Sequence, residues 1–287
     1  MSKYKHVFGV ETEIEKQNPV MTPAVSELLR SHMRYIGNLD TWSQYIIWFY
    51  TMGSGSVNRF LAKIPLDLKI QHWWATRFFS YYNVKLYGIN NIPEPYKVYK
   101  RFFENSKGFE KLPFNVQTEI STFLMETYIN NLQTLILQAP KTVGPITLYK
   151  VSSQYPGLPV AGKVAIVEQG PFNSTTWDKR VNLSMFLPNL NVACCYWVLS
   201  IAPGTSLLAI DAPVDAYPEE REVLLPYGSV FDIKEAHIDI VRVKVTTGKT
   251  EMQFGPPYVI GEVYQFNAGD TIELKMLTYH ANCCQKK

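Results

Sequence analysis

Hydrophobic residues recur at helical spacing in the first half of the chain and fall in short runs in the second half. Thr22 and Pro23 predict the start of a helix, because threonine caps helices and proline fits the first turn. Residues 41–52 carry a second apolar face, and residues 114–138 carry a longer one with helical spacing. Residues 62–115 hold further helical sequence, so the first half is predicted to be mostly α.

The Gly-Ser-Gly-Ser stretch at 53–56 separates the helix expected at 41–52 from the apolar residues at 57–61. Such a stretch before a helix can cradle a phosphate, but this one lacks the Gly-Lys-Ser/Thr ending of a phosphate-binding loop. We therefore expect a turn between two helices here.

After Ala139-Pro140 the pattern changes to short runs of branched and aromatic residues, divided by Gly, Pro, Asn and Ser. We expect a short helix at 191–195, and strands at 146–151, 163–167, 196–201, 207–210, 222–225, 229–233, 238–245 and 271–277. Helices followed by strands predict an α+β fold, with a helical N-terminal lobe packed on a mostly antiparallel two-sheet β core.

The domain organisation expected from this order is simple. An irregular lead-in covers residues 1–20, and one domain covers residues 21–287. Within that domain the helical lobe takes residues 21–140 and the β-rich core takes residues 141–287.

Composition narrows the function classes. The 287 residues are 46% hydrophobic and 18% charged, as in a globular protein, and the net charge of +3 indicates no nucleic-acid partner. Because the chain shows neither an N-terminal apolar segment nor an apolar run of about 18 residues, we expect an intracellular protein without a membrane span. The four cysteines form two adjacent pairs without zinc-site spacing, and no metal is expected.

The stretch Tyr217–Pro226 reads Tyr-Pro-Glu-Glu-Arg-Glu-Val-Leu-Leu-Pro and places carboxylates two residues apart, at Glu220 and Glu222. If the chain is extended from Glu220, both side chains point to the same face. Like charges at the mouth of an apolar strand cost stability, and functional sites tolerate such a cost. The alternative is a solvated, charged hairpin turn.

Two further residues extend the pattern. Lys150 ends the first predicted strand, and Ser184 follows some thirty residues later. The cation suits a diphosphate, the hydroxyl can orient a carboxylate, and the carboxylates suit a sugar hydroxyl and a cationic transition state. Together they make a plausible nucleotide site.

With these motifs in this order, the sequence resembles the mono-ADP-ribosyltransferases of the bacterial exoenzyme and binary actin-modifying toxin type, which have phage and viral relatives. That family carries an aromatic-Arg motif, then a Ser-Thr-Ser motif, then an E-x-E turn followed by Val/Ile-Leu-Leu and Gly-Ser-x-Phe. The corresponding residues are Tyr149-Lys150, Ser184-Met185-Phe186 and 220–231. Tyr50, Gly53-Ser54-Gly55 and Asn58 are similar to residues of the family's helical lobe, and the resemblance covers about residues 20–250.

The resemblance implies an NAD-dependent transfer of ADP-ribose to an acceptor protein, and a glutamate rather than a glutamine at position 220 implies arginine as the acceptor residue. It assigns catalysis to Glu222, Glu220 and Ser184, with Ser184 holding Glu222. It implies that NAD is bound through Tyr149 and Lys150, with Asn182 as a further contact. Arg180 is an alternative cation for the diphosphate. Tyr217 and Arg221 would belong to the turn that recognises the target.

Two alternatives stay open. Lys150 replaces the family's arginine and loses its bidentate geometry, and Met185 and Phe186 replace two positions of the serine motif. A catalytically degenerate member of the same fold, acting as a binding or structural module, is therefore the second interpretation. A third is an NAD glycohydrolase that transfers ADP-ribose to water alone.

Overall fold

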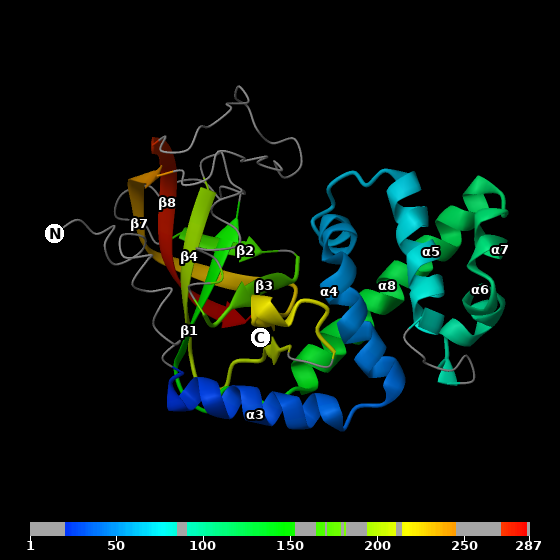
Figure 1. Ribbon diagram of the computed structural model, residues 1–287, viewed down its shortest axis with the longest axis horizontal. Coiled ribbons are helices and arrows are strands. Elements are labelled where there is room, and N and C mark those ends of the chain that lie inside the picture. The colour runs from blue at the N-terminus through cyan, green and yellow to red at the C-terminus, as the bar shows by residue number, and fades with distance from the viewer. Residues whose placement is uncertain are drawn as a thin grey trace.

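A computed structural model describes residues 21–84, 91–152, 165–169, 171–178, 181, 194–210, 214–244 and 271–285. The lead-in expected at residues 1–20 lies outside them. Helices gather on one side of the molecule and strands on the other, with one helix running along the base (Figure 1). The predicted α+β class, with a helical lobe beside a mostly antiparallel sheet, is confirmed.

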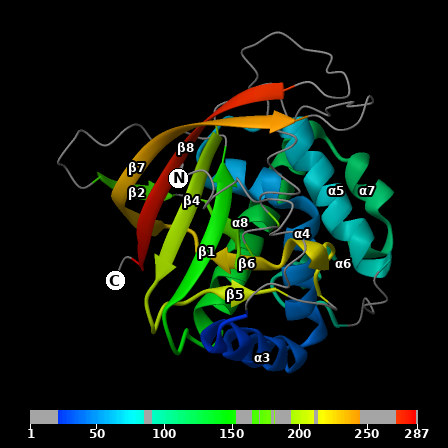
Figure 2. The same cartoon turned by 60° about the vertical axis from the view of Figure 1, so that its left-hand side comes forward.

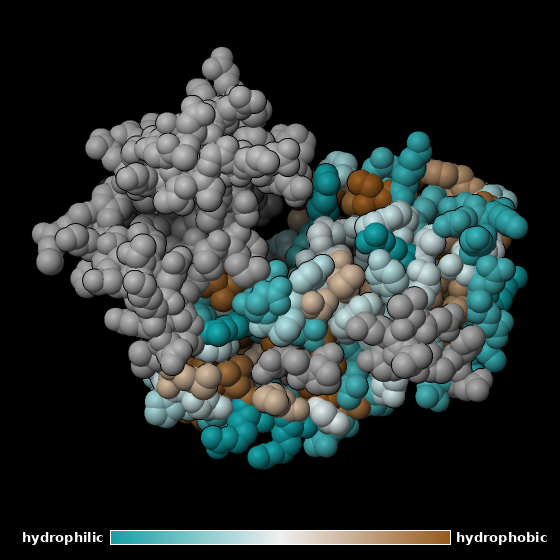
Figure 3. Space-filling view, viewed as in Figure 1, coloured by the Kyte–Doolittle hydropathy of each residue, from teal (hydrophilic) through white to brown (hydrophobic). Residues whose placement is uncertain are grey.

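The helices follow the predicted periodicity closely. They are α3 (Pro23–Gly37), α4 (Thr41–Leu61), α5 (Leu68–Val84), the 3₁₀ turn η2 (Tyr96–Tyr99), α6 (Lys100–Glu104), α7 (Ser106–Glu110) and α8 (Phe114–Gln138). The backbone N–H of Val25 donates to the Thr22 hydroxyl at 3.2 Å, which is the expected cap of α3. Hydrophilic residues cover much of the outer surface of these helices (Figure 3).

Aromatic side chains fill the core of the helical lobe. Tyr45, Phe78 and Tyr128 are fully buried, and their rings pack edge-on or tilted. Their polar ends are satisfied, because the Tyr45 hydroxyl donates to the Phe78 carbonyl at 2.6 Å and the Tyr128 hydroxyl donates to the Ile46 carbonyl at 2.9 Å. The aromatic side chains of Trp74, Phe78, Phe79 and Tyr82 therefore serve helix packing, whereas Trp73 is exposed.

The Gly-Ser stretch forms a kink within one helix. α4 continues from Thr41 to Leu61, but Gly53 has non-helical dihedrals of φ −160° and ψ 36°. The expected break between two helical segments is thus present, although the chain resumes its helix at once. The kink turns the segment around Asn58 back toward Tyr50.

The strands form one hydrogen-bonded sheet with a weak seam. They are β1 (Ile146–Ser152), β2 (Ala165–Gln169), β3 (Asn173–Thr176), β4 (Cys194–Ile201), β5 (Leu208–Ala209), β6 (Glu222–Leu225), β7 (Ser229–Lys244) and β8 (Thr271–Gln285). Their order is β2-β7-β8-β4-β1-β3-β6-β5, and among these described strands only β4 and β8 pair in parallel. Figure 2 shows β7 and β8 as long curved strands beside β4 and β1.

The sequence predicts two sheets, whereas the described strands form one sheet that this seam divides into two groups. A single residue pair, Tyr149 with Thr176, joins β1 to β3. On one side lie β2, β7, β8, β4 and β1, and on the other lie β3, β6 and β5.

Three details differ from the sequence-based expectation. β3 was not expected, because its sequence Asn-Ser-Thr-Thr is entirely polar. Cys194 and Cys195 begin β4 instead of ending a helix, since they pair with Met276 and Leu277 of β8. The two strands expected at 229–233 and 238–245 are one strand with an irregularity after Ile233.

α3 ties the helical lobe to the sheet. Its Val25 and Leu28 pack with strand residues such as Leu148 and Val223, whereas its Ile36 packs in the aromatic core. Between them, His32 is fully buried. Its Nε2–H donates to the Pro140 carbonyl at 2.8 Å and its Nδ1 accepts from the Ala209 N–H at 2.9 Å, which fixes a neutral tautomer.

This junction makes stability depend on pH. Burial lowers the pKa of His32 to about 4 from an ordinary value of 6.5, against a smaller opposing effect of the Pro140 hydrogen bond. Between pH 6.5 and pH 4 the unfolded chain therefore binds a proton at His32 that the folded chain does not bind. The contribution of His32 to the free energy of unfolding is complete above pH 6.5 and is lost as the pH falls toward 4.

We expect the free energy of unfolding of the wild type, relative to that of His32→Gln, to fall by on the order of 3 kcal/mol between pH 7 and pH 4. Urea unfolding at both pH values measures this difference. Ser31→Ala on the same helix should keep the wild-type pH dependence. A difference between wild type and His32→Gln that stays constant with pH would contradict the neutral, buried histidine.

Candidate active site

A buried carboxyl group lies at the centre of the candidate site. Glu222 is the first residue of β6, its side chain is 6% exposed, and its carbonyl accepts from the Ile210 N–H at 2.9 Å. Burial raises the pKa of Glu222 to about 8, the charges of Asp215 and Glu220 add to the rise, and a hydrogen bond with Ser174 opposes it. The carboxyl group is therefore placed where it costs stability, as the sequence indicates.

Ser174 lies on β3, directly beside the catalytic candidate. In the antiparallel register Ser174 pairs with Leu224 and Thr176 pairs with Glu222, which places Ser174 and Glu222 diagonally across the two strands. The Thr175 hydroxyl donates to the Val223 carbonyl at 2.5 Å and tightens the same pairing. This serine is absent from the sites predicted from the sequence.

A signal for Ser174 is present in the sequence. Ser174-Thr175-Thr176 matches the Ser-Thr-Ser pattern at two positions and keeps a hydroxyl at the third. Ser184, the serine to which this role was assigned, lies outside the described residues, as do Arg180 and Asn182.

The helical lobe contributes a tyrosine close enough to Glu222 for its pKa to depend on the charge of that residue. Tyr50 of α4 is buried, and its pKa is raised by burial and by the charge of Glu222. Hydrogen bonds with Asn58, at 3.1 Å from Nδ2 to the hydroxyl, and with Ser54 hold it. The Oδ1 atom of Asn58 is buried without a hydrogen-bond partner. The structure thus brings the three polar residues around the α4 kink to the site.

The E-x-E turn is not extended at Glu220. The prediction that an extended backbone points Glu220 and Glu222 to the same face is therefore wrong. Pro218–Glu220 forms a 3₁₀ turn, η5, and Arg221 has left-handed dihedrals of φ 50° and ψ 49°. The strand begins only at Glu222. The two carboxylates are nevertheless close enough for the charge of Glu220 to affect Glu222.

The other residues of the turn differ in their exposure to solvent. Tyr217 is 42% exposed, and its N–H donates to the Asp215 carboxylate at 2.8 Å. The Arg221 guanidinium instead forms an ion pair with Asp178. Burial raises the pKa of the half-buried Glu220, and the charges of Asp215 and Glu219 add to it. An exposed aromatic ring and a partly exposed carboxyl group therefore lie on one short turn.

The predicted diphosphate cation contacts β3. The Lys150 ammonium donates to Asn173 Oδ1 at 2.5 Å, and burial lowers the pKa of Lys150 to about 8. Asn173 immediately precedes Ser174, so consecutive residues of β3 contact Lys150 and Glu222. Tyr149, Thr176 and Glu222 form a row across three neighbouring strands.

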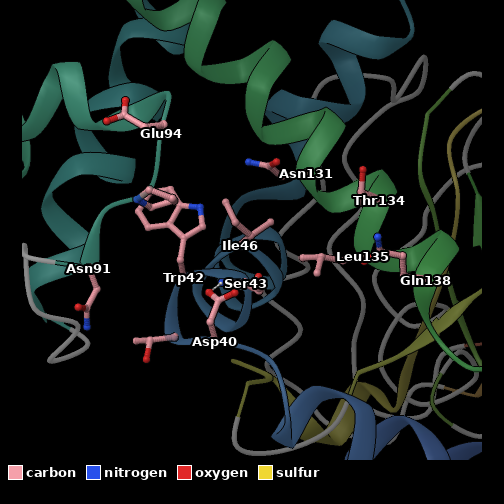
Figure 4. A pocket seen from close by; sticks show the side chains of 12 residues that line it. Asp40, Trp42, Ser43, Ile46, Asn91, Glu94, Asn131, Thr134, Leu135 and Gln138 are labelled. Carbon is pink, nitrogen blue, oxygen red and sulfur yellow. Dashed lines mark hydrogen bonds between the residues drawn. The ribbon is translucent and has the colours of Figure 1, made fainter.

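A separate cavity of about 540 Å³ lies in the helical lobe, between the start of α4, the loop at 91–94 and the end of α8. Figure 4 shows Asp40, Trp42, Asn131 and Gln138 among its lining. None of the predicted site residues lines it. Within the described ranges no cluster of His, Cys, Asp and Glu suits a metal ion, and no helix combines the length and apolar character of a membrane span.

The chain is similar in fold to solved structures of bacterial ADP-ribosyltransferase toxins. Plx2a, an ADP-ribosyltransferase toxin from Paenibacillus larvae, is 14% identical over 95% of this chain and 97% of that chain, with a TM-score of 0.48. C3stau2 from S. aureus, solved with NAD, is 13% identical over 94% and 99%, with a TM-score of 0.46. BECa of a binary enterotoxin of C. perfringens, solved with NADH, is 12% identical over 91% of this chain and 48% of that chain, with a TM-score of 0.47.

No family model and no curated protein matches the chain. The solved structures are of the class that the sequence motifs resemble, and a viral or phage relationship stays a prediction. Because the TM-scores of these structures are below 0.5, the function is inferred from the residues of the site.

The raised pKa of Glu222 predicts a pH dependence opposite in sign to that of His32. The unfolded carboxyl group ionises near pH 4.5, whereas the folded one stays protonated to about pH 8, so stability falls as the pH rises between these values. Glu222→Gln should match the wild type near pH 4.5 and exceed its free energy of unfolding at pH 9 by on the order of 4 kcal/mol.

Chemical denaturation at the two pH values tests this expectation, with the exposed Glu219→Gln as the control. A wild type as stable as Glu222→Gln at pH 9 would show that the Glu222 carboxyl group ionises there at no cost.

Proposed function

We propose that the protein is an NAD-dependent mono-ADP-ribosyltransferase that moves ADP-ribose from NAD to a side chain of an acceptor protein and releases nicotinamide. The observation that carries this proposal is the buried Glu222 at the head of β6, hydrogen-bonded to Ser174 and preceded in the turn by Glu220. A carboxylate held in a water-poor place is suited to stabilise developing positive charge.

The reaction needs few groups. The bond between ribose C1′ and the nicotinamide nitrogen breaks, the electron pair leaves with nicotinamide, and positive charge develops on the ribose. Glu222 would accept a hydrogen bond from a ribose hydroxyl and stabilise that charge. An acceptor nitrogen then forms a bond to C1′ and loses its proton.

The protonation state of Glu222 fits a cationic substrate. Without NAD, burial keeps the carboxyl group largely protonated at neutral pH. The positive charge of an oxidised nicotinamide ring close by would favour the ionised form. Substrate binding would thus supply the carboxylate that the transition state requires, while Ser174 keeps it oriented.

The residues around Glu222 are suited to hold the dinucleotide. Lys150 supplies a point charge for the diphosphate, although without the fork of an arginine. Asn58 Oδ1 lacks a partner and can accept a hydrogen bond from a substrate. We assign Tyr149 to the same site and retain Arg180 and Asn182 as candidates for contacts from outside the described residues.

We propose that Ser174, and not Ser184, is the serine that holds Glu222. The hydrogen bond between Ser174 and Glu222 and the register of β3 with β6 support this choice. With Ser174-Thr175-Thr176 the motif keeps all of its hydroxyl groups, which removes one of the two reasons for the degenerate interpretation.

The acceptor is proposed to be arginine. Glu220 lies on the turn beside Glu222, half-buried, where its carboxylate would pair with a guanidinium and draw it toward the ribose. Tyr217 is exposed on the same turn and offers a flat surface to the acceptor protein.

One contact favours the second interpretation, a non-catalytic binding module. Lys150 already donates to Asn173, and burial favours its neutral form. A cation engaged in this way attracts a diphosphate less strongly. Titration calorimetry with NAD separates the interpretations, because a module that has lost NAD binding gives no heat at millimolar NAD.

Substitutions at the carboxylates should separate the two steps of the reaction. Glu222→Gln should lower NAD cleavage by roughly 100- to 1,000-fold, because the transition-state charge loses its partner. Ser174→Ala should lower it by roughly 10- to 100-fold. Glu220→Gln should leave NAD hydrolysis largely intact and abolish transfer to agmatine, a small guanidine acceptor.

Nicotinamide release and labelled agmatine measure the two steps. Ser206→Ala, which removes a hydroxyl bonded to Lys141 away from the turn, serves as the control. Unchanged nicotinamide release by Glu222→Gln would falsify its catalytic assignment.

Lys150 should affect substrate binding more than chemistry. Lys150→Ala should raise the KM for NAD by about tenfold and change kcat little, because removal of a ground-state contact weakens substrate and transition state equally. Lys150→Arg should restore or improve the KM. Steady-state kinetics with NAD test both, and an equal fall in kcat for Lys150→Ala would place the lysine at the reacting atoms instead.

A further inference from the structure

The turn that carries Glu220 is fastened to β3 through Arg221. The guanidinium pairs with the Asp178 carboxylate and lies over the Trp177 ring, 5.0 Å from its centroid. The side chain of Asp178 is 4% exposed and that of Arg221 is 35% exposed. Arg221 therefore directs its charge inward to the end of β3, and most of its side chain is unavailable to a partner protein.

The ion pair stands at the end of the ladder that carries the catalytic carboxyl group. Thr176 pairs with Glu222, Asp178 follows Thr176 by two residues, and Arg221 precedes Glu222 by one. The Asp178 N–H also donates to the Thr176 hydroxyl at 3.2 Å, which fixes the end of β3. The contact thus lies one residue from Glu222 on β6.

The backbone of Arg221 gives this contact a second consequence. Its left-handed dihedrals are unfavourable for a residue with a side chain, and surrounding contacts must hold them. The Arg221 N–H donates to the Pro218 carbonyl at 3.3 Å, and the guanidinium pairs with Asp178. Because this residue separates Glu220 from Glu222, its conformation sets how the two carboxylates face each other.

We propose that Arg221 is a positioning residue. Its ion pair with Asp178, supported by the Trp177 ring, holds the left-handed turn and so fixes Glu220 and Glu222 relative to each other. This inference rests on the proposed transferase function and replaces the target-recognition role implied by the family resemblance for Arg221. Recognition of the acceptor is then left to the exposed Tyr217.

The experiment compares NAD hydrolysis, which needs no acceptor, with transfer to agmatine. Arg221→Ala, Asp178→Asn and the double variant should each lower kcat for both reactions by a similar factor, roughly 10- to 100-fold, with the KM for NAD changed less than about twofold. The losses should not add, because either change breaks the same contact.

Two replacements refine the test. Arg221→Lys should recover part of the activity, because the charge remains. Arg221→Gly relaxes the backbone but removes the guanidinium, and it should stay impaired. Arg30→Ala, which breaks an exposed ion pair with Glu27 on α3, is the matched control and should behave as wild type. Melting temperatures identify variants that do not fold, and in that case Arg221→Lys and Arg221→Gly carry the comparison.

Several outcomes overturn the inference. If Arg221→Ala impairs transfer to agmatine but not NAD hydrolysis, and Asp178→Asn is fully active, Arg221 binds the acceptor and does not position the turn. If Arg221→Gly is fully active, the ion pair is dispensable. Wild-type activity in Arg221→Ala contradicts the positioning role only, whereas a wild type that releases no nicotinamide contradicts the proposed function and this role together.

Discussion

The four-residue ladder between β3 and β6 is the constraint on which the site depends. It places Ser174 beside Glu222, aligns Thr176 with Glu222, and brings Asp178 within reach of Arg221. β6 enters both hydrophobic cores, because Leu224 packs with the helical lobe and Val223 packs with α3. The hydrogen bond with Ser174 on this ladder offsets part of the cost of burying the Glu222 carboxyl group.

Strong local signals predicted much of the fold. α8 spans Phe114–Gln138, as its apolar spacing indicates, and α3 begins after its predicted cap at Thr22. β3 could not be predicted in this way, because Asn173 to Thr176 carry no apolar alternation. Three of its four residues are buried, Ser174 being the exposed one, and the strand forms by pairing with β6, which is a tertiary effect that no local pattern encodes.

The candidate site was predicted unevenly for the same reason. Glu220 and Glu222 stand out as a charged pair before an apolar strand, and Tyr50 and Asn58 were indicated by the resemblance. Ser174-Thr175-Thr176 matches the family motif, but the strand register that places Ser174 beside Glu222 is visible only in the structure. The left-handed conformation of Arg221 has no sequence signature in an arginine, since its neighbours impose it.

The single backbone pair between Tyr149 and Thr176 has a mechanical consequence. Where two groups of strands share one pair, a tensile load across the sheet cannot spread over a ladder and concentrates at that point. The side-chain hydrogen bond of Lys150 with Asn173 crosses the same line and adds a second contact there. Pulling on the chain should therefore part the described sheet along the line that separates Lys150 from Glu222.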